Sequence, residues 1–316
     1  MQNTYPTREG EVDFLAPGAG KPCSTWYKVV GKLDVPPLIV LHGGPGAGHE
    51  YMETLVDLCE QYGIPIVLYD QVGCGRSTHF REKHGDEGFW TMNLFVAELD
   101  NLIDHLQLRD VGFSLLGQSW GGILAGAYAC RRPKGLMKLI IAGGPASLPL
   151  YMKGCQHLLA QLPPDVRRTI EECESKGDYE SEDFNKASAV FYARHFCRLD
   201  PFPEAVQIGF QHLKEDPTAY LTIPEYYMLA LMLAAYLSRQ GPSEFTIIGS
   251  FKDWEPYKEA HNIEVPTLLL NGEHDEAMDL SIEPWFQTIS KVKWVTLSGA
   301  SHMTHWEQRE RFNELC

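Results

Sequence analysis

Ser119 lies at the centre of a Gly-x-Ser-x-Gly pattern at residues 117–121. An apolar run at 111–116 precedes this pattern, and a small-residue helical pattern at 123–130 follows it. A strand, a sharp turn and a helix form the setting in which a serine is held in strained backbone geometry at the edge of a sheet. A serine hydroxyl becomes a nucleophile only when a neighbouring base takes its proton. The pattern therefore indicates acyl-transfer chemistry and requires a base elsewhere in the chain.

Two later apolar runs, at 265–270 and 292–297, are typical of buried strands, and each ends in a short polar loop. The first loop carries Asp275 and the second carries His302. If these strands are parallel to the strand before Ser119, the three side chains project from the same edge of one sheet. The order Ser, Asp, His is the one that this architecture uses. We predict that His302 is the general base and that Asp275 fixes its tautomer.

Other residues compete for these roles. Glu273 is nearer the strand end than Asp275, and Asp279 belongs to the following segment, whereas the loop at Asp275 can bend back to the histidine. His305 is a rival base, but Trp306-Glu307-Gln308 after it reads as the start of a terminal helix where His305 would pack or cap. The two histidines have no glutamate between them and no third ligand is apparent. We therefore expect no metal.

An oxyanion site is predicted after a third buried strand. The apolar run 38–41 ends in His-Gly-Gly-Pro-Gly at 42–46. A glycine cluster in this position leaves backbone N–H groups that point into a crevice, where the negative oxygen of a tetrahedral intermediate can be bound. The predicted donors are the N–H of Trp120 and one N–H from Gly43 or Gly44.

The elements that would position these residues follow an α/β order. Strand and helix patterns alternate up to about residue 142, which predicts a mostly parallel, doubly wound sheet. From 147 to 240 only helical stretches with caps and breakers occur, and strand patterns resume at 265. We expect a core formed by residues 1–146 and 246–316, with residues 147–245 inserted as a helical lid over the carboxyl edge of the sheet.

Composition excludes several classes of function. The 316 residues carry a formal net charge of −15, which argues against nucleic-acid binding because that needs a basic face. The glycine-rich loop at 70–77 is not followed by Gly-Lys-Ser/Thr, so we expect no nucleotide and no other cofactor. We also expect no membrane segment and no secretory signal. Eight cysteines without CxxC pairing indicate free thiols and a cytoplasmic location.

Several motifs together resemble the proline iminopeptidase family of α/β-hydrolases. They are His-Gly-Gly-Pro-Gly at 42–46, Asp-Gln-Val-Gly-Cys-Gly-Arg-Ser at 70–77, Gly-Gln-Ser-Trp-Gly-Gly at 117–122, Gly-Pro-Ser-Glu-Phe at 241–245, Lys-Asp-Trp at 252–254 and Ser-His-Met at 301–303. The resemblance is closest to the branch that contains prolyl aminopeptidases and L-amino acid amidases. It implies an α/β-hydrolase fold and an acyl-enzyme mechanism on a small molecule or short peptide with a free amino terminus.

The same resemblance implies a carboxylate that binds the substrate's α-ammonium. It assigns this role to Glu244 in the Gly-Pro-x-Glu-Phe motif, and Glu204 is a second candidate. Val72 stands where many members carry arginine, and residues 226–237 are unusually rich in Leu, Met and Ala. These departures leave the predicted triad intact and leave open whether proline is the preferred acyl residue.

Two other functions are compatible with the same residues. One is an esterase or lactonase of specialised metabolism, with the lid adapted to a neutral apolar substrate. The other is a ligand-binding protein on a hydrolase fold in which catalysis is incidental. An epoxide hydrolase is disfavoured because that chemistry needs a carboxylate nucleophile where Ser119 stands. The oligomeric state is not predicted.

Overall fold

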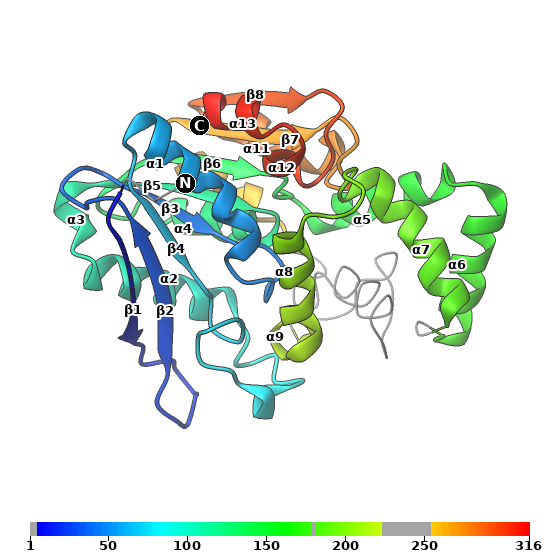
Figure 1. Ribbon diagram of the computed structural model, residues 1–316, viewed down its shortest axis with the longest axis horizontal. Helices are drawn as coiled ribbons and strands as arrows, with labels where there is room; N and C mark the ends of the chain where they lie inside the picture. The colour runs from blue at the N-terminus through cyan, green and yellow to red at the C-terminus, as the bar shows by residue number, and fades with distance from the viewer. Residues whose placement is uncertain (1–4, 179–180, 223–253) are drawn as a thin grey trace.

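The computed structural model describes residues 5–178, 181–222 and 254–316 (Figure 1). Within these ranges one eight-stranded sheet forms, in the order β1-β2-β4-β3-β5-β6-β7-β8. The strands are β1 (Thr7–Asp13), β2 (Ser24–Val30), β3 (Leu38–Leu41), β4 (Ile66–Tyr69), β5 (Phe113–Gln118), β6 (Leu136–Ala142), β7 (Thr267–Gly272) and β8 (Val292–Leu297). This architecture confirms the predicted α/β class and the mostly parallel sheet.

The parallel part of the sheet brings three loops to one edge. β3, β4, β5, β6, β7 and β8 run parallel to one another, while β1 and β2 form an antiparallel hairpin that joins the sheet by antiparallel pairing of β2 with β4. Every residue of β3 and β4 is buried, as expected for apolar strands covered on both faces. The carboxyl ends of β5, β7 and β8 therefore lead into the loops that carry the predicted nucleophile, acid and base.

Helices flank this sheet in the amino- and carboxyl-terminal parts of the chain. They are η1 (Glu50–Val56), α1 (Asp57–Tyr62), η2 (Arg81–Lys83), α2 (Met92–His105), α3 (Leu108–Val111), α4 (Trp120–Ala129), η3 (Pro256–Asn262), α11 (Asp279–Thr288), α12 (Thr304–Glu307) and α13 (Arg309–Leu315). α4 packs against β5, β6 and β3. It begins directly after Ser119, so the backbone of the predicted nucleophile is fixed by both a strand and a helix.

Between β6 and residue 222 the described chain is helical and contains no strand. The helices are α5 (Leu148–Ala160), α6 (Pro164–Lys176), α7 (Glu182–His195), α8 (Glu204–Glu215) and α9 (Thr218–Thr222). Side-chain oxygens of Ser147 and Ser181 accept N–H groups in the first turns of α5 and α7, and Gly177 ends α6 in the left-handed conformation. We call residues 148–222 the cap. The rest of the predicted lid, 223–245, lies outside the described residues.

Several predicted boundaries differ from the structure. The strand before Ser119 was expected at 111–116, but β5 begins at Phe113 because Leu108–Val111 forms a short helix and Gly112 follows it at φ 86°. Helical spacing of the apolar residues at 51–62 predicts one helix, but its first part is the 3₁₀ segment η1. The strand pattern at 11–16 likewise predicts a first strand there, whereas β1 is at Thr7–Asp13. Each difference moves an element by a few residues and leaves the order unchanged.

Two histidine–carboxylate pairs join α8 and the residue after it to the core. His212 Nε2 lies 3.0 Å from Glu50 Oε1 in η1, and His79 Nδ1 lies 2.5 Å from Asp216 Oδ2. Hydrogen bonds to these carboxylates raise the pKa of His212 and of His79. Burial opposes ionisation of Glu50 and Asp216, but the hydrogen bonds to the histidines are among the contacts that lower both pKa values. Each pair is therefore strongest when the histidine is charged and the carboxylate ionised.

We expect α8 to be held to the core most firmly between about pH 5 and 6.5 and to loosen at higher pH. A raised histidine pKa contributes stability that is complete below the unfolded value and is lost as pH rises through the folded value. The lowered pKa values of Glu50 and Asp216 contribute stability that is present above the unfolded values and is lost as the pH falls through the folded values. Hydrogen exchange of α8 amides, corrected for intrinsic rates, should accelerate between about pH 6 and 9 relative to β5.

The double variant H79Q/H212Q should remove this pH dependence. His84→Gln is the matched control, because His84 is an exposed histidine that lies outside the cap. If the α8 amides of the unaltered protein are equally protected from exchange at about pH 6 and at about pH 9, the expected loosening of α8 is contradicted.

Candidate active site

Ser119 occupies a sharp turn between β5 and α4. Its backbone has φ 56° and ψ −124°, a conformation that a non-glycine residue adopts at a cost of about 1–3 kcal/mol. Neighbouring glycines make the turn possible. A Cβ on Gly117 would lie 2.0 Å from the Gly121 carbonyl oxygen, and one on Gly121 would lie 2.1 Å from the Leu41 oxygen. The Gly-x-Ser-x-Gly pattern thus reflects close backbone packing on both sides of the serine.

His302 and Asp275 form a buried hydrogen-bonded pair. The His302 Nδ1 and Asp275 Oδ1 atoms are 2.7 Å apart, and both side chains are 1% exposed. Asp275 also accepts backbone N–H groups from Ala277 at 2.8 Å and from Gly272 at 3.3 Å. An ionised carboxylate held in this way fixes the proton on Nδ1 and leaves Nε2 as the basic nitrogen. The predicted acid and base are therefore brought together.

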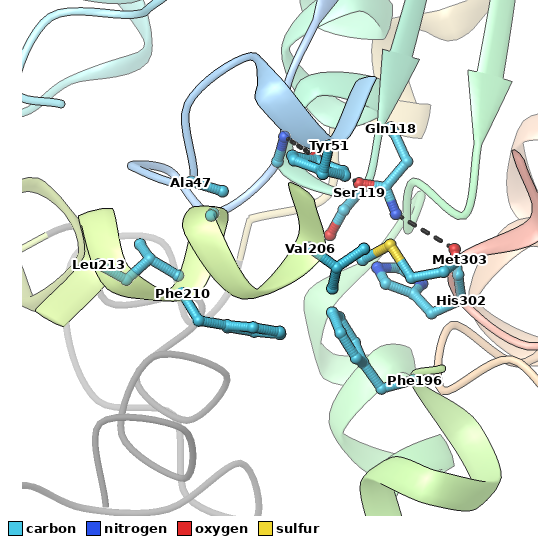
Figure 2. Close-up of a pocket in the computed structure, with 13 residues that line it drawn as sticks. Ala47, Tyr51, Gln118, Ser119, Phe196, Val206, Phe210, Leu213, His302 and Met303 are labelled. Carbon is cyan, nitrogen blue, oxygen red and sulfur yellow. Dashed lines mark hydrogen bonds between the residues drawn. The ribbon is translucent and has the colours of Figure 1, made fainter. Parts of the chain in front are cut away.

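Ser119 and His302 line the same pocket (Figure 2). The Ser119 hydroxyl and the His302 Nε2 atom are both buried, and neither has a hydrogen-bond partner among the described residues. Two complementary groups without partners in one pocket are available to each other and to a substrate. Catalytic hydrogen bonds often tighten only when substrate binds. The arrangement can thus supply a nucleophile and a base that act on one carbonyl group.

The rival residues have other contacts. Glu273 is exposed, and its carboxylate accepts hydrogen bonds from Ser298 Oγ and Gly299 N at 2.8 Å. His305 is buried in α12, where Nε2 lies 3.1 Å from the Tyr51 carbonyl oxygen. Burial lowers the pKa of His305 to about 3. Neither residue contacts the Ser119 hydroxyl, so the interpretation of His305 as a packing residue agrees with its surroundings.

The predicted oxyanion donors differ in their availability. The Gly43 N–H donates to the Tyr51 hydroxyl at 2.5 Å, while no described residue accepts a hydrogen bond from the Gly44 N–H. Gly44 has φ 110°, and a Cβ there would lie 2.5 Å from the Gly46 nitrogen. Trp120 is the first residue of α4, so its N–H belongs to the partly positive end of the helix. Of the two alternatives, Gly44 is thus the better candidate to act with Trp120.

Comparison with known proteins agrees with this geometry. A profile described as alpha/beta hydrolase fold matches residues 36–308. The proline iminopeptidase of Saccharolobus solfataricus is 34% identical over 278 residues, which cover 88% of this chain and 82% of that protein. A crystal structure of proline iminopeptidase from Mycobacterium smegmatis is 33% identical, covers 97% of this chain and 96% of that chain, and has a TM-score of 0.82. The chain belongs to the proline iminopeptidase family of α/β-hydrolases.

A second solved structure, that of VinJ, is also similar. It is 38% identical, covers 98% of this chain and 96% of that chain, and has a TM-score of 0.85. Membership of the proline iminopeptidase family confirms the resemblance that the motifs predicted. The similarity extends over the cap as well as the sheet, since nearly the whole chain is covered in both comparisons.

The pocket above Ser119 has an apolar wall. Besides the polar residues of the site, it is lined by side chains from the cap and from the loop after His302, namely Phe196, Val206, Phe210, Leu213 and Met303 (Figure 2). Three of these come from α8. An acyl group bound here would contact mainly carbon atoms.

A carboxylate that the sequence analysis missed lies beside the base. Glu276 directly follows Asp275, is 1% exposed, and has its Oε1 atom 3.8 Å from His302 Nε2. The Tyr151 hydroxyl lies 3.3 Å from the same oxygen. A buried carboxylate is costly unless a cation or hydrogen-bond donors compensate its charge. Its position directly after Asp275 could have pointed to it, but the sequence analysis considered only Glu273 and Asp279 as alternative carboxylates on this loop.

The two predicted ammonium-binding residues are placed differently. Glu204 is exposed in the first turn of α8 and is not among the residues that line the pocket. A carboxylate at that position is favourable for the helix itself, because it lies near the partly positive amino-terminal end. Glu244 lies outside the described residues.

The glycine-rich loop at 70–77 is part of the framework behind the site. Asp70 Oδ1 accepts the backbone and ring N–H groups of His49, and Asp70 Oδ2 accepts the Arg76 N–H. The Val72 N–H donates to Glu98, whose pKa is raised to about 8 by burial. Two N–H groups of the loop, those of Val72 and Arg76, are thus already bound to side-chain carboxyl groups.

One grouping of potential metal-ligand atoms occurs among the described residues. It comprises His49, Glu50 and Asp70, with the atoms within 4.8 Å of one another. The hydrogen bonds that join Asp70 to His49 and Glu50 to His212 already account for these side chains. We interpret the group as a polar network that supports the neighbouring loops. The described helices also include none long and apolar enough to cross a membrane.

Proposed function

We propose that the protein is a serine hydrolase that cleaves the amide bond after a free N-terminal amino acid. Its substrates would be short peptides or amino acid amides. The observation that carries the proposal is the single pocket lined by Ser119 and His302, with Asp275 on the far side of the imidazole and Glu276 beside Nε2. The names of the relatives, proline iminopeptidase, support the same reaction.

In the proposed acylation, Ser119 Oγ attacks the carbonyl carbon while its proton moves to His302 Nε2. The carbonyl oxygen becomes an oxyanion and accepts the N–H groups of Trp120 and Gly44. His302 then gives its proton to the leaving amine, and the C–N bond breaks to leave an acyl-serine. Asp275 keeps the Nδ1 proton in place throughout.

Deacylation repeats these steps with water. His302 Nε2 accepts a proton from the attacking water, a second oxyanion forms in the same N–H groups, and the proton returns to Ser119 Oγ as the acyl bond breaks. The amino acid is released and the serine is regenerated.

Selectivity for a free amino terminus would come from a buried carboxylate. Glu276 does not line the pocket, but its Oε1 atom is 3.8 Å from His302 Nε2, the nitrogen that would face the reacting carbonyl, and it would bind the substrate's ammonium from there. An N-acetylated substrate would bring an uncharged group to this carboxylate and would lack the charge-assisted hydrogen bond that a free ammonium makes. The resemblance implies the same role for Glu244, which lies outside the described residues. Glu204, being exposed, is the weakest of the three candidates.

Glu276→Gln should lower kcat/KM for free aminoacyl nitroanilides by about 10- to 100-fold, the value of one charge-assisted hydrogen bond. The rate with simple aryl esters should change by no more than about 3-fold, because these substrates have no cation to lose. The measurement is a panel of aminoacyl nitroanilides, each tested free and N-acetylated. Glu273→Gln, an exposed carboxylate on the same loop, is the matched control.

The same panel separates the competing functions. Equal losses on nitroanilides and esters would show that Glu276 positions His302 and does not bind the ammonium. Cleavage of prolyl substrates alone defines an iminopeptidase, and broad cleavage defines an aminopeptidase or amidase. Activity on aryl esters with none on free nitroanilides would favour the esterase or lactonase alternative, which the apolar pocket wall could also serve.

We also infer a reducing compartment, such as the cytoplasm, for the protein. All eight cysteines are free, and seven of them are buried. Burial raises the pKa of several of these thiols, among them Cys130 and Cys197, each to about 12. Buried neutral thiols are unreactive packing groups and fit a chain that does not depend on disulfides.

A further inference from the structure

The Tyr51 hydroxyl lies at the junction of the oxyanion loop and the nucleophile turn (Figure 2). It accepts the Gly43 N–H at 2.5 Å and donates to Gln118 Oε1 at 2.7 Å. An ideal Cβ on Gly43 would lie 2.9 Å from both of these side-chain oxygens and 3.0 Å from Ser119 Cβ. The loop therefore lies directly against the tyrosine on one side and against the nucleophile on the other.

The other end of Tyr51 is held by the segment that follows the catalytic histidine. The Tyr51 carbonyl oxygen accepts hydrogen bonds from His305 Nε2 at 3.1 Å and from Trp306 Nε1 at 2.8 Å. Gln118 in turn donates to the His302 carbonyl oxygen at 3.3 Å. Tyr51, 3% exposed, thus connects the three loops that carry the oxyanion donors, the nucleophile and the base.

We propose that Tyr51 is a positioning residue that holds the Gly43–Gly44 segment so that the Gly44 N–H faces the reacting oxygen. This inference rests on the proposed function. Two consecutive glycines have unusual conformational freedom, so the loop needs an external restraint. The hydrogen bond from the Gly43 N–H to the Tyr51 hydroxyl supplies that restraint. Because the Gly43 N–H is used in this bond, the Gly44 N–H is the one that would bind the oxyanion.

The hydroxyl suits this role because it can accept and donate at once. Burial raises the pKa of Tyr51, so the group stays protonated through the neutral range. It can therefore donate to Gln118 while its lone pair accepts the Gly43 N–H. Phenylalanine at this position would keep the packing and leave the Gly43 N–H buried without an acceptor, which favours rotation of the loop away from its working geometry.

The test is the rate at which a fluorophosphonate modifies Ser119. In this reaction the Ser119 oxygen forms a bond to phosphorus, fluoride leaves, the serine proton passes to His302, and the phosphoryl oxygen occupies the oxyanion site. The rate therefore reports on the oxyanion donors without requiring knowledge of the natural substrate. Tyr51→Phe should lower the second-order labelling rate by about 10- to 100-fold, the range for a weakened oxyanion donor.

Turnover provides a second readout. For free aminoacyl nitroanilides, Tyr51→Phe should lower kcat by a similar factor and change KM by less than about 3-fold, because the oxyanion forms only in the transition state. Tyr27→Phe is the matched control, since Tyr27 is also buried and its hydroxyl lies 3.1 Å from His105 Nε2 in another part of the core. Its labelling rate should equal that of the unaltered protein.

An unchanged labelling rate in a folded Tyr51→Phe variant would overturn the positioning role. If labelling falls in Tyr51→Phe while free aminoacyl substrates are never cleaved, the proposed function fails and the role of Tyr51 stands. Should Tyr51→Phe not fold, Gln118→Met removes the acceptor of the tyrosine proton and should slow labelling in the same direction. Unchanged labelling in that variant would equally reject the proposal.

Discussion

Ser119→Ala is expected to lower kcat by about 10⁴- to 10⁶-fold, the range seen when a nucleophile is removed from a serine hydrolase triad. The substitution deletes the one atom that would form the acyl bond and leaves the apolar wall of the pocket unchanged. Ligand binding should therefore be retained, with a dissociation constant within about 3-fold of the original. Steady-state kinetics and calorimetric titration with an amino acid product measure the two quantities separately.

The control for this prediction is Ser188→Ala. Ser188 is fully buried in the cap helix α7 and is not part of the pocket above Ser119, so turnover should be unaffected. Rates in Ser119→Ala that match those of the unaltered protein would exclude the acyl-serine mechanism. Loss of both turnover and binding would indicate a folding defect, which the thermal unfolding midpoint would reveal.

Asp275→Asn is expected to lower kcat by about 10³- to 10⁴-fold. The asparagine amide can donate to His302 Nδ1, which places the imidazole proton on Nε2, where it cannot accept the proton of Ser119. The Ala277 and Gly272 N–H groups, which now bind the carboxylate, would also have to share a single carbonyl oxygen. KM should change little because Asp275 does not line the pocket.

Glu273→Gln is the matched control for Asp275→Asn. Glu273 is two residues away on the same loop, carries the same charge and binds Ser298 and Gly299 at the surface. We expect its kcat to stay within about 2-fold of the original value, as for most exposed substitutions. A severe loss in Glu273→Gln with a mild loss in Asp275→Asn would reverse the assignment of the acid.

The sequence predicted best the bounds of two strands. β3 and β8 have the predicted bounds, 38–41 and 292–297, because each is a run of strand-forming residues bordered by Pro, Gly or polar breakers. The positions of Ser119, Asp275 and His302 were predicted from the strands that precede them, β5, β7 and β8, since parallel strands carry their loops to one edge.

Features decided by tertiary contact were not predictable in this way. Whether Gly43 or Gly44 offers its N–H depends on the Tyr51 hydroxyl, which is eight residues away and approaches from another element. Glu276 faces His302 because the loop after β7 turns there, and no periodicity in the sequence encodes that turn. The start of β5 was misjudged because Val111, though apolar, belongs to a short helix and is 37% exposed.

The origin of the pocket wall has a consequence for how such enzymes diversify. The predicted reacting groups come from loops of the sheet, whereas three residues of the pocket wall, Val206, Phe210 and Leu213, all come from α8. Substitutions at these three positions can enlarge, narrow or reshape the space for an acyl chain while the predicted catalytic residues stay the same. Substitutions in this one helix can thus change the substrate specificity of related enzymes while the reaction itself stays the same.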